Sequence, residues 1–285
     1  DCADVQFFIH VDKKVDINSF KKEVGKKSNV IWIKERLNVQ WGGWNQVRYQ
    51  MLFLQEAFEK NIEIERLFII TGQDYPLWSN RDIAEACGNS PNKVWMIGQN
   101  LTQIEGFSYM KKFLRIPHLW RDVDFKSNRL RRYITGLQRA LFLLICPNVR
   151  CDYLVVSGKI WDIWQSSGYF SCNKEVGLYI LNVLRKEKKI VGYFKYSFVP
   201  EEMVIPTIIF NSVYQCEAQI VSDNKYRGLS TLAALHKFIY TKSIKVFAVE
   251  DYKELKKSNK MFIRKVETGI SDSLVDRIEN DRKCF

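Results

Sequence analysis

The segment "VQFFIHVD", residues 5–12, begins a run of alternating apolar strands and helices, and this run decides the expected fold. "INSFKKEVGKK" (17–27) is a short basic helix or loop, and "NVIWIK" (29–34) is a second strand. "NQVRYQMLFLQEAFEK" (45–60) has apolar residues at helical spacing, with Asn45 as the expected N-cap. A third strand, a capped helix start and a fourth strand follow in "RLFIITG" (66–72), "SNRDIAEAC" (79–87) and "KVWMIG" (93–98). The alternation predicts an α/β fold in which helices flank a mixed central sheet.

The second half of the chain returns to regular structure after a basic stretch. Between about residues 98 and 150 the periodicity weakens and lysines and arginines accumulate, which indicates an excursion over one face of the sheet. Regular segments resume with "CDYLVVSG" (151–158), "KEVGLYILNVLRKEKK" (174–189) and "VIPTIIFNS" (204–212), and "DSLVDRIENDRK" (272–283) predicts a solvated amphipathic helix. Neither an internal repeat nor a low-complexity linker is present, so one domain over residues 1–285 is expected.

Composition limits the class of protein and of partner. With 285 residues, 46% of them hydrophobic, the chain can bury a large core. Its net charge of +12 favours anionic partners, but does not separate nucleic acid from a nucleotide-sugar or an acidic lipid. The seven cysteines are scattered and lack C-x-x-C pairs, which favours a reduced cytosolic compartment. The most apolar run, "ALFLLIC" (140–146), is much shorter than the roughly 20 residues of a membrane span.

Acidic residues stand where chemistry is expected in an open α/β sheet, at the carboxyl ends of strands. Asp12 follows the first strand in "IHVDKK", and Asp74 follows the third in "ITGQDYP". Each carboxylate could accept hydrogen bonds from a base or sugar, or cap its own turn. Glu201 and Glu202 in "VPEEMVIP" follow a proline and precede an apolar run. They belong either to a solvated loop or to a rigid turn that presents one carboxylate to a substrate.

Five motifs taken together carry a family resemblance. In order and spacing, "FIHVDKK", "WGGWNQV", "ITGQDYPL", "PEEMVIPTIIFNS" and "MFIRKV" resemble the core-2/I-branching β-1,6-N-acetylglucosaminyltransferase family and its peptide O-xylosyltransferase relatives. The resemblance covers nearly the whole chain. It implies a GT-A type fold with a nucleotide-binding half (1–110) and an acceptor and catalytic half (150–285). It also implies an inverting, metal-independent transfer from a UDP-sugar to an acceptor hydroxyl, with GlcNAc as the expected sugar and xylose as the alternative.

The resemblance also assigns the donor and catalytic residues. The second acid of the P-[DE]-E motif is the catalytic base, here Glu202, and Glu201 is the orienting acid. A single displacement needs one carboxylate to take the proton of the acceptor hydroxyl. Expected donor contacts are Asp12 at the uracil, Gly72 and Asp74 at the edge of the donor pocket, and Lys242 and Lys265 at the diphosphate, with Lys245 and Arg264 as alternative cations.

Four residues are candidates for contact with the acceptor or the donor, and most of them also have a purely structural interpretation. Trp41 and Trp44 flank a Gly-Gly pair that either approaches the donor or belongs to aromatic packing. Ser167 in "SSGYF" matches an acceptor loop loosely, and Arg131 either touches the acceptor or lies on a solvated basic face. His10 is expected to be packed or hydrogen-bonded rather than catalytic. Neither a cofactor nor a metal is expected, so the D-x-D of Asp122 and Asp124 is interpreted as a surface turn.

The resemblance has gaps, and they leave other functions open. The family places a strand and a helix before the H-V-D strand, and they have no counterpart here, so we expect an N-terminal piece to be missing. The aromatic residue that packs the acceptor is replaced near Thr231. We expect a bacterial member in the cytoplasm, peripheral to the inner membrane and in contact with its anionic surface, with a glycan acceptor and no nucleic-acid partner. The alternatives are a basic nucleic-acid-binding protein and a catalytically inactive scaffold.

Overall fold

A computed structural model describes residues 5–61, 63–105, 153–195, 197–240 and 243–283, with isolated positions between 130 and 141. The helices are α1 Ile17–Val24, α2 Asn45–Phe58, α3 Asn80–Asn89, α6 Lys174–Lys186, α7 Lys188–Phe194, α8 Val204–Phe210, α9 Tyr252–Lys257 and α10 Asp272–Lys283. The strands are β1 Phe7–Ile9, β2 Val30–Trp32, β3 Arg66–Phe68, β4 Asp74–Pro76, β5 Ile97–Asn100, β6 Tyr153–Val156, β7 Lys159–Asp162, β8 Trp164–Gln165, β9 Ser171–Asn173, β10 Gln219–Ile220, β11 His236–Lys237 and β12 Phe262–Arg264. Short 3₁₀ turns follow at η1 Pro200–Glu202, η2 Val213–Glu217, η3 Leu229–Leu232 and η4 Val249–Asp251.

The mixed α/β class is confirmed, but the expected single central sheet is not formed as one hydrogen-bonded sheet. Within the described ranges the strands make five small sheets, β1-β2, β10-β5-β8, β11-β12-β4, β3-β9 and β6-β7, with parallel and antiparallel pairs. The strands are two to four residues long, so each pairing ends after a few hydrogen bonds. Single contacts connect the pieces, such as the bond from Trp95 N to Ser171 O at 2.9 Å, which joins the residues before β5 to β9.

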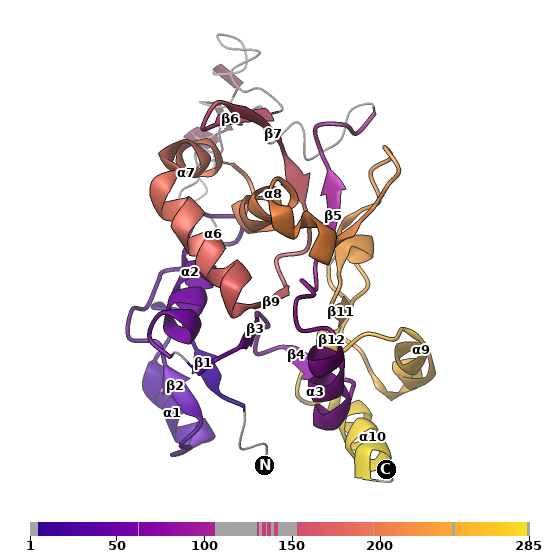
Figure 1. Cartoon of the computed structure of the whole chain (residues 1–285). Coiled ribbons are helices and arrows are strands. Elements are labelled where there is room, and N and C mark those ends of the chain that lie inside the picture. Colours follow the sequence, from indigo (N-terminus) through magenta and orange to yellow (C-terminus); the bar gives the residue numbers. More distant parts are fainter. Residues whose placement is uncertain are drawn as a thin grey trace.

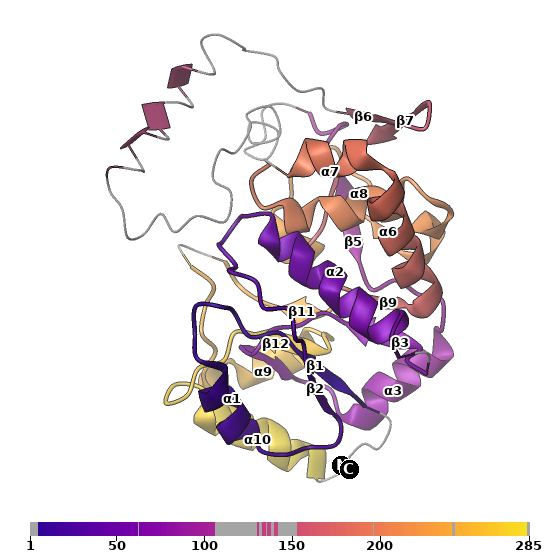
Figure 2. The ribbon, with the colours of Figure 1, turned by 90° about the vertical axis from the view of Figure 1, so that its left-hand side faces the viewer.

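Most of the helices lie on two sides of these strands. Figures 1 and 2 show α2, α6, α7 and α8 gathered on one side, and α3, α9 and α10 around the β11-β12-β4 sheet. The largest hydrophobic core lies among α2, α6 and α8. A Cβ added to Gly177 of α6 would lie 2.2 Å from Cε2 of Phe58, so glycine permits α2 and α6 to pack closely. The amphipathic helix at 272–283 is confirmed, and its Leu274 and Ile278 are buried in a smaller core.

Two local predictions need correction. The helix beginning at residue 45 is confirmed, but Trp44 rather than Asn45 is its N-cap. The side-chain amide of Asn45 instead donates to Asn38 O at 2.9 Å, which ties the helix to the preceding loop. The fourth strand runs over 97–100 rather than 93–98, because the residues before it make only isolated backbone contacts. The capped start of α3 is confirmed, since Ser79 and Asp82 form a capping box.

Two features bear on the expected compartment. In the part of the chain that the structure describes, no helix has the length and apolar character that a membrane crossing requires. Cys87, Cys172 and Cys216 are free thiols, and the other four cysteines lie outside the described residues.

Candidate functional site

The two glutamates lie on a fixed turn at the start of α8. Val199, directly before the turn, has φ 45° and ψ 55°, a left-handed conformation that is strained for a β-branched residue. Its backbone N–H donates to Gly42 O at 3.2 Å, and Glu202 N donates to Val199 O at 3.1 Å. Pro200 suits the first position of the 3₁₀ turn because its φ is already near the helical value. The sequence Val-Pro-Glu-Glu therefore forms a rigid turn rather than a solvated loop.

Glu202 has the properties of a base that works near neutral pH. Its side chain is half-buried, and Nε2 of Gln165 donates to its Oε2 at 3.0 Å. Its carbonyl accepts from Ser166 N at 2.9 Å, so β8 and the turn are joined at two points. Burial raises the pKa of Glu202 to about 7, although the bond from Gln165 acts in the opposite direction. A carboxylate with this pKa can both accept and release a proton at physiological pH.

Glu201 points into a tightly packed position beside the loop 166–169. It is only 6% exposed, and a Cβ on Gly168 would lie 3.3 Å from its Cγ. The loop is held by Nε2 of Gln50 of α2, which donates to Gly168 O at 2.9 Å. Ser167 is buried as well, and its hydroxyl donates to Tyr169 O at 2.9 Å and accepts from Tyr169 N at 3.3 Å. An acceptor contact for Ser167 stays a prediction.

Tyr169 connects the glutamate turn to a buried ion-pair cluster. The guanidinium carbon of Arg264 lies 4.9 Å from the centroid of the Tyr169 ring. Nη1 of Arg264 donates to Oδ1 of Asp74 at 2.8 Å and also bonds to the Thr71 hydroxyl. Oδ2 of Asp74 lies 3.2 Å from Nε2 of His236. Tyr169 also interacts with the charges of Glu201 and Glu202, so it stands between the glutamate turn and the Arg264–Asp74 pair.

The charge states in this cluster follow from its geometry. Burial raises the pKa of Asp74, but its bonds and charge interactions with His236 and Arg264 outweigh burial, and the pKa is lowered overall. Burial lowers the pKa of Arg264, but Tyr169 and Asp74 outweigh burial, so the pKa is raised overall and the guanidinium stays charged. The Asp74 side chain is fully buried, whereas that of Arg264 is 13% exposed. Asp74 is therefore placed to orient Arg264, and its own contact with a donor stays a prediction.

Asp12 and Gly72 lie in two separate turns. The carboxylate of Asp12 accepts from Lys14 N at 2.9 Å and from Val39 N at 3.3 Å, and 27% of the side chain is exposed. The turn-capping interpretation of Asp12 is confirmed, and a uracil contact stays a prediction. Gly72 lies exposed in the turn between Thr71 and Asp74, with open space where a Cβ would be.

The lysines that were expected to bind phosphate pair with nearby carboxylates or lie outside the described residues. Nζ of Lys265 bonds to the carboxylate of Glu267, and Lys265 N donates to Lys245 O at 3.3 Å. Nζ of Lys245 lies 2.6 Å from Oδ1 of Asp251. Four other predicted positions, Lys242, Arg131, Asp122 and Asp124, lie outside the described residues. Within the described ranges, no three His, Cys, Asp or Glu side chains converge into a set of metal ligands.

The W-G-G-W turn lies directly against the glutamate turn. Trp41 is 71% exposed, and its ring meets Phe198 edge-on at a centroid distance of 5.0 Å. Gly42 has φ 73°, and an added Cβ would lie 3.1 Å from Phe198, so glycine suits both the left-handed backbone and this close approach. Trp44 is half-buried against the main core, which confirms aromatic packing for that residue. Trp41 remains the aromatic side chain available at the surface of the turn.

The prediction that His10 is hydrogen-bonded and packed is confirmed, because its Nε2 accepts from Leu37 N at 3.0 Å and its ring stacks on Tyr49.

Several residues of the candidate site were not predicted from the sequence. Gln165, Tyr49, His236 and Tyr226 were missed. None stands in a local motif, since each reaches the site through a pairing of distant segments.

A family model matches most of the chain. The model described as Core-2/I-Branching enzyme matches residues 3–226. The chain belongs to the Core-2/I-branching enzyme family. Members of this family are glycosyltransferases, and family membership implies a sugar donor and an acceptor. The matched range contains Trp41, Asp74 and Glu202 but ends before Arg264, whose place at the site rests on the structure. No curated protein matches the chain significantly.

Proposed function

We propose that this Core-2/I-branching enzyme is a GT-A type, inverting glycosyltransferase that moves a sugar from a UDP-sugar to an acceptor hydroxyl. The observation that carries the proposal is the half-buried Glu202, bonded to Gln165 on a rigid turn and with its pKa raised to about 7. In this mechanism Glu202 takes the proton of the acceptor hydroxyl while that oxygen attacks the anomeric carbon and UDP departs. The pair of electrons of the broken glycosidic bond leaves with the β-phosphate oxygen.

The arrangement of the two acids supports a single displacement. A retaining mechanism uses two carboxyl groups about 5 Å apart that face each other across the sugar. Glu201 and Glu202 are neighbours on one 3₁₀ turn, and Glu201 is packed against Gly168. We assign Glu201 to holding the turn and Glu202 to proton transfer. Attack from the side opposite the leaving UDP then inverts the anomeric centre.

Fixed cations are proposed to stabilise the leaving diphosphate without a metal. Negative charge gathers on the β-phosphate as the bond breaks, and an oriented cation lowers the energy of that transition state. Arg264 is oriented by Asp74 and lies beside Tyr169, so we place it at the diphosphate with Lys265, and Lys242 as a further contact. Asp12 and Gly72 would border the nucleoside part of the donor.

The acceptor side is proposed at the exposed face of the W-G-G-W turn. Trp41 offers an exposed aromatic ring next to the glutamate turn, a surface on which a sugar ring can stack. Ser167 and Arg131 are the further acceptor contacts that we propose. GlcNAc is the proposed donor sugar, with xylose as the alternative.

We further propose that the enzyme works in the cytoplasm at an anionic membrane surface. Residues 13–27, around α1, contain six exposed lysines against two acids; the lysines are Lys13, Lys14, Lys21, Lys22, Lys26 and Lys27. Clustered lysines contribute about 1 kcal/mol each near an anionic bilayer. Co-sedimentation with phosphatidylglycerol vesicles, but not with phosphatidylcholine vesicles, is the expected result, and equal sedimentation with both would refute this placement.

A donor panel followed by a turnover assay tests the proposed function. UDP, UDP-GlcNAc, UDP-xylose, UDP-glucose, UDP-galactose and UDP-glucuronate are compared by thermal shift, and the donor that stabilises most is then assayed for transfer. The proposal expects stabilisation by UDP and by one sugar donor, with turnover. A nucleic-acid-binding protein would instead show no UDP shift and steeply salt-dependent DNA or RNA binding. An inactive scaffold would show no turnover with any donor.

A further inference from the structure

A polar hollow lies on the opposite face of the β5-β8 pair from the glutamate turn. Gln99 of β5 pairs with Gln165 of β8, and Asn100 pairs with Trp164. Because neighbouring residues of a strand point to opposite faces, Asn100 and Trp164 face away from the side on which Gln165 meets Glu202. Asn100 and Trp164 line a cavity of about 440 Å³ there, within the roughly 300–1,000 Å³ usual for small-ligand sites. The cavity is therefore separate from the proposed transfer site.

The polar groups of this cavity are arranged around one carboxylate. Oδ2 of Asp162 accepts from Nδ2 of Asn100 at 2.7 Å and from Nε2 of Gln103 at 3.2 Å, which fixes the orientation of the carboxyl group. In the described part of the chain, neither Oδ1 of Asp162 nor the side-chain amide of Gln215 has a hydrogen-bond partner. An oriented acceptor and an amide donor thus share one cavity.

The charge of the cavity excludes an anionic ligand. Its described lining holds two carboxylates, Asp162 and Asp223, several amides, and neither lysine nor arginine. This is unusual in a chain with a net charge of +12. Asp223 is paired with Arg227 beside the cavity, so among the described residues Asp162 is the lining carboxylate without a cationic partner. A diphosphate or an acidic sugar would meet the uncompensated negative charge of Asp162 there. Neutral hydroxyl groups suit it, because they donate to carboxylates and accept from amides.

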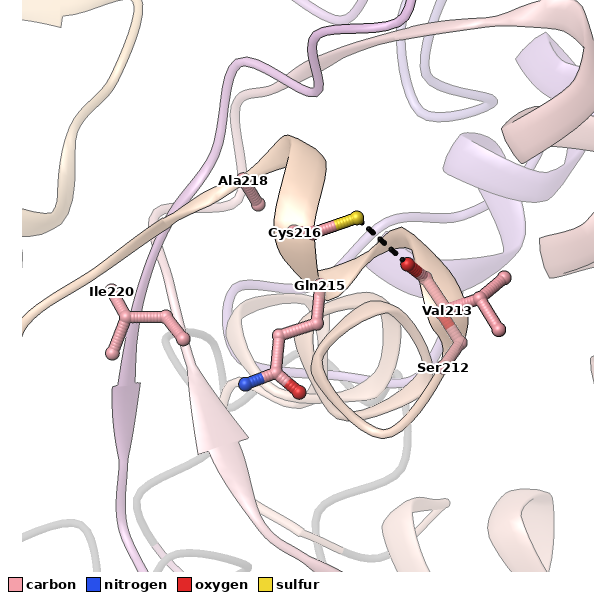
Figure 3. A pocket seen from close by; sticks show the side chains of 6 residues that line it. All are labelled: Ser212, Val213, Gln215, Cys216, Ala218 and Ile220. Atoms are coloured by element: carbon pink, nitrogen blue, oxygen red, sulfur yellow. Dashed lines mark hydrogen bonds between the residues drawn. The ribbon is translucent and has the colours of Figure 1, made fainter.

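The cavity continues into an adjoining hollow with apolar edges. Gln215 and Ile220 line both, so together they make one groove, which we call the Gln215 groove. Figure 3 shows the Gln215 amide and the Ile220 side chain directed into the space between η2 and the neighbouring strands. Ile220 and Val213 are 38% and 80% exposed. Sugar rings combine apolar C–H faces with hydroxyl edges. The apolar side chains of the groove can contact the faces, and its carboxylate and amide groups can bond to the hydroxyls.

We propose that the Gln215 groove is a carbohydrate-binding site for a neutral glycan, distinct from the site of transfer. Asp162 and Gln215 bond to neighbouring hydroxyls, while Ile220 covers a ring face. The segment 221–224 lines the groove, and two residues further the pKa of Tyr226 is raised, first by burial and then by the nearby charge of Glu202. The groove would hold a distal part of a glycan chain on the enzyme between transfers.

Saturation-transfer-difference NMR on the full chain tests the site without turnover. The probes are the neutral sugars lactose, cellobiose, maltotriose and N,N′-diacetylchitobiose, with 3′-sialyllactose as the acidic comparison. At least one neutral probe is expected to give a signal at least fivefold above that of 3′-sialyllactose. The signal should fall at least fivefold in Gln215→Trp, which fills the groove, and in Asn224→Ala, which removes an exposed amide with little risk to folding.

The controls separate this site from transfer. Trp41→Ala and Glu202→Gln should keep the signal, because both residues lie at the transfer site. Absence of a signal from every neutral probe would overturn the proposal, as would a signal that survives both groove variants. A signal lost in Trp41→Ala would assign binding to the transfer site and would overturn it too. If the protein binds sugars in the groove but shows no turnover, the proposed function fails while the groove stands.

Discussion

The side-chain amide of Gln165 donates to Oε2 of Glu202 at 3.0 Å, and this bond joins strand β8 to the turn that carries the glutamates. The backbone bond from Ser166 N to Glu202 O reinforces the connection. The bond favours the ionised carboxylate, whereas burial favours the neutral acid, and burial is the larger effect. Burial and the Gln165 hydrogen bond therefore shift the pKa of Glu202 in opposite directions, and a mutation of Gln165 removes one of these effects.

The pH dependence of transfer is expected to follow Glu202. A base must be ionised to accept a proton, so kcat/KM should rise with pH and reach a plateau above about 7. Gln165→Leu removes the bond that favours ionisation and should move the midpoint of the rise to higher pH. A pH–rate profile of each protein measures this. Gln6→Leu, at an exposed position before β1, is the control and should keep the wild-type midpoint. If the midpoint of the pH profile is unchanged in Gln165→Leu, Glu202 is not the titrating group.

The stability of the fold should also depend on Glu202. Its pKa is about 7 in the folded state and 4.5 when unperturbed, so the folded state binds the proton more tightly. The stabilising contribution of this group is complete below about 4.5 and is lost as the pH rises to about 7. Glu202→Gln keeps the neutral form and should raise the melting temperature at pH 8, with no change at pH 4. Thermal melts at both pH values test this, and a lower melting temperature at pH 8 would contradict it.

The proposed phosphate cations should affect UDP binding and rate together. A unit charge pair about 4 Å apart contributes roughly 4 kcal/mol at an effective dielectric near 20, before desolvation. We expect Lys265→Ala to weaken UDP binding and to lower turnover by about a hundredfold or more, with Arg264→Ala at least as severe and Lys242→Ala similar. Titration calorimetry with UDP and steady-state kinetics measure both effects. Arg81→Ala, at an exposed position of α3, should change neither. Unchanged UDP affinity in all three variants would remove the proposed cation site.

Transfer is expected to continue without divalent metal. Excess EDTA should leave the rate unchanged, and Asp122→Ala combined with Asp124→Ala should leave donor affinity nearly unchanged. The assay compares EDTA-treated enzyme with enzyme supplied with manganese. Loss of activity on chelation that manganese restores would show that the D-x-D pair, or another site, holds a catalytic metal.

Local sequence patterns predicted the elements of the fold better than their assembly. The helices beginning at Asn45 and Asn80 and the helix at 272–283 follow from apolar spacing and capping residues. The division of the sheet into five pieces cannot be predicted from such local patterns, because it depends on how far each strand pairs before the chain bends. The left-handed Val199 is equally invisible in the sequence, since a β-branched residue there is held by tertiary contacts.

The site was predictable where a motif carried it and not where distant segments meet. The Pro-Glu-Glu motif indicated Glu202, and the "MFIRKV" motif placed Arg264 among the alternative cations. The pairing of Arg264 with Asp74 arises from the antiparallel β12-β4 contact between residues 190 positions apart. Gln165 meets Glu202 because β8 packs against the turn. Such contacts depend on the three-dimensional fold, and nothing in the local sequence marks Gln165 or the pairing of Arg264 with Asp74.

The transfer rate of Glu202→Gln, measured beside its affinity for the UDP-sugar, tests the central claim most directly. Glutamine keeps the size and the hydrogen bonding of the side chain but cannot accept the proton. Transfer should fall by about two to four orders of magnitude, the usual effect of losing a general base, while donor affinity stays unchanged. Glu201→Gln serves as the matched variant and should reduce transfer less. A Glu202→Gln enzyme with the wild-type transfer rate would contradict the assignment of Glu202 as the base.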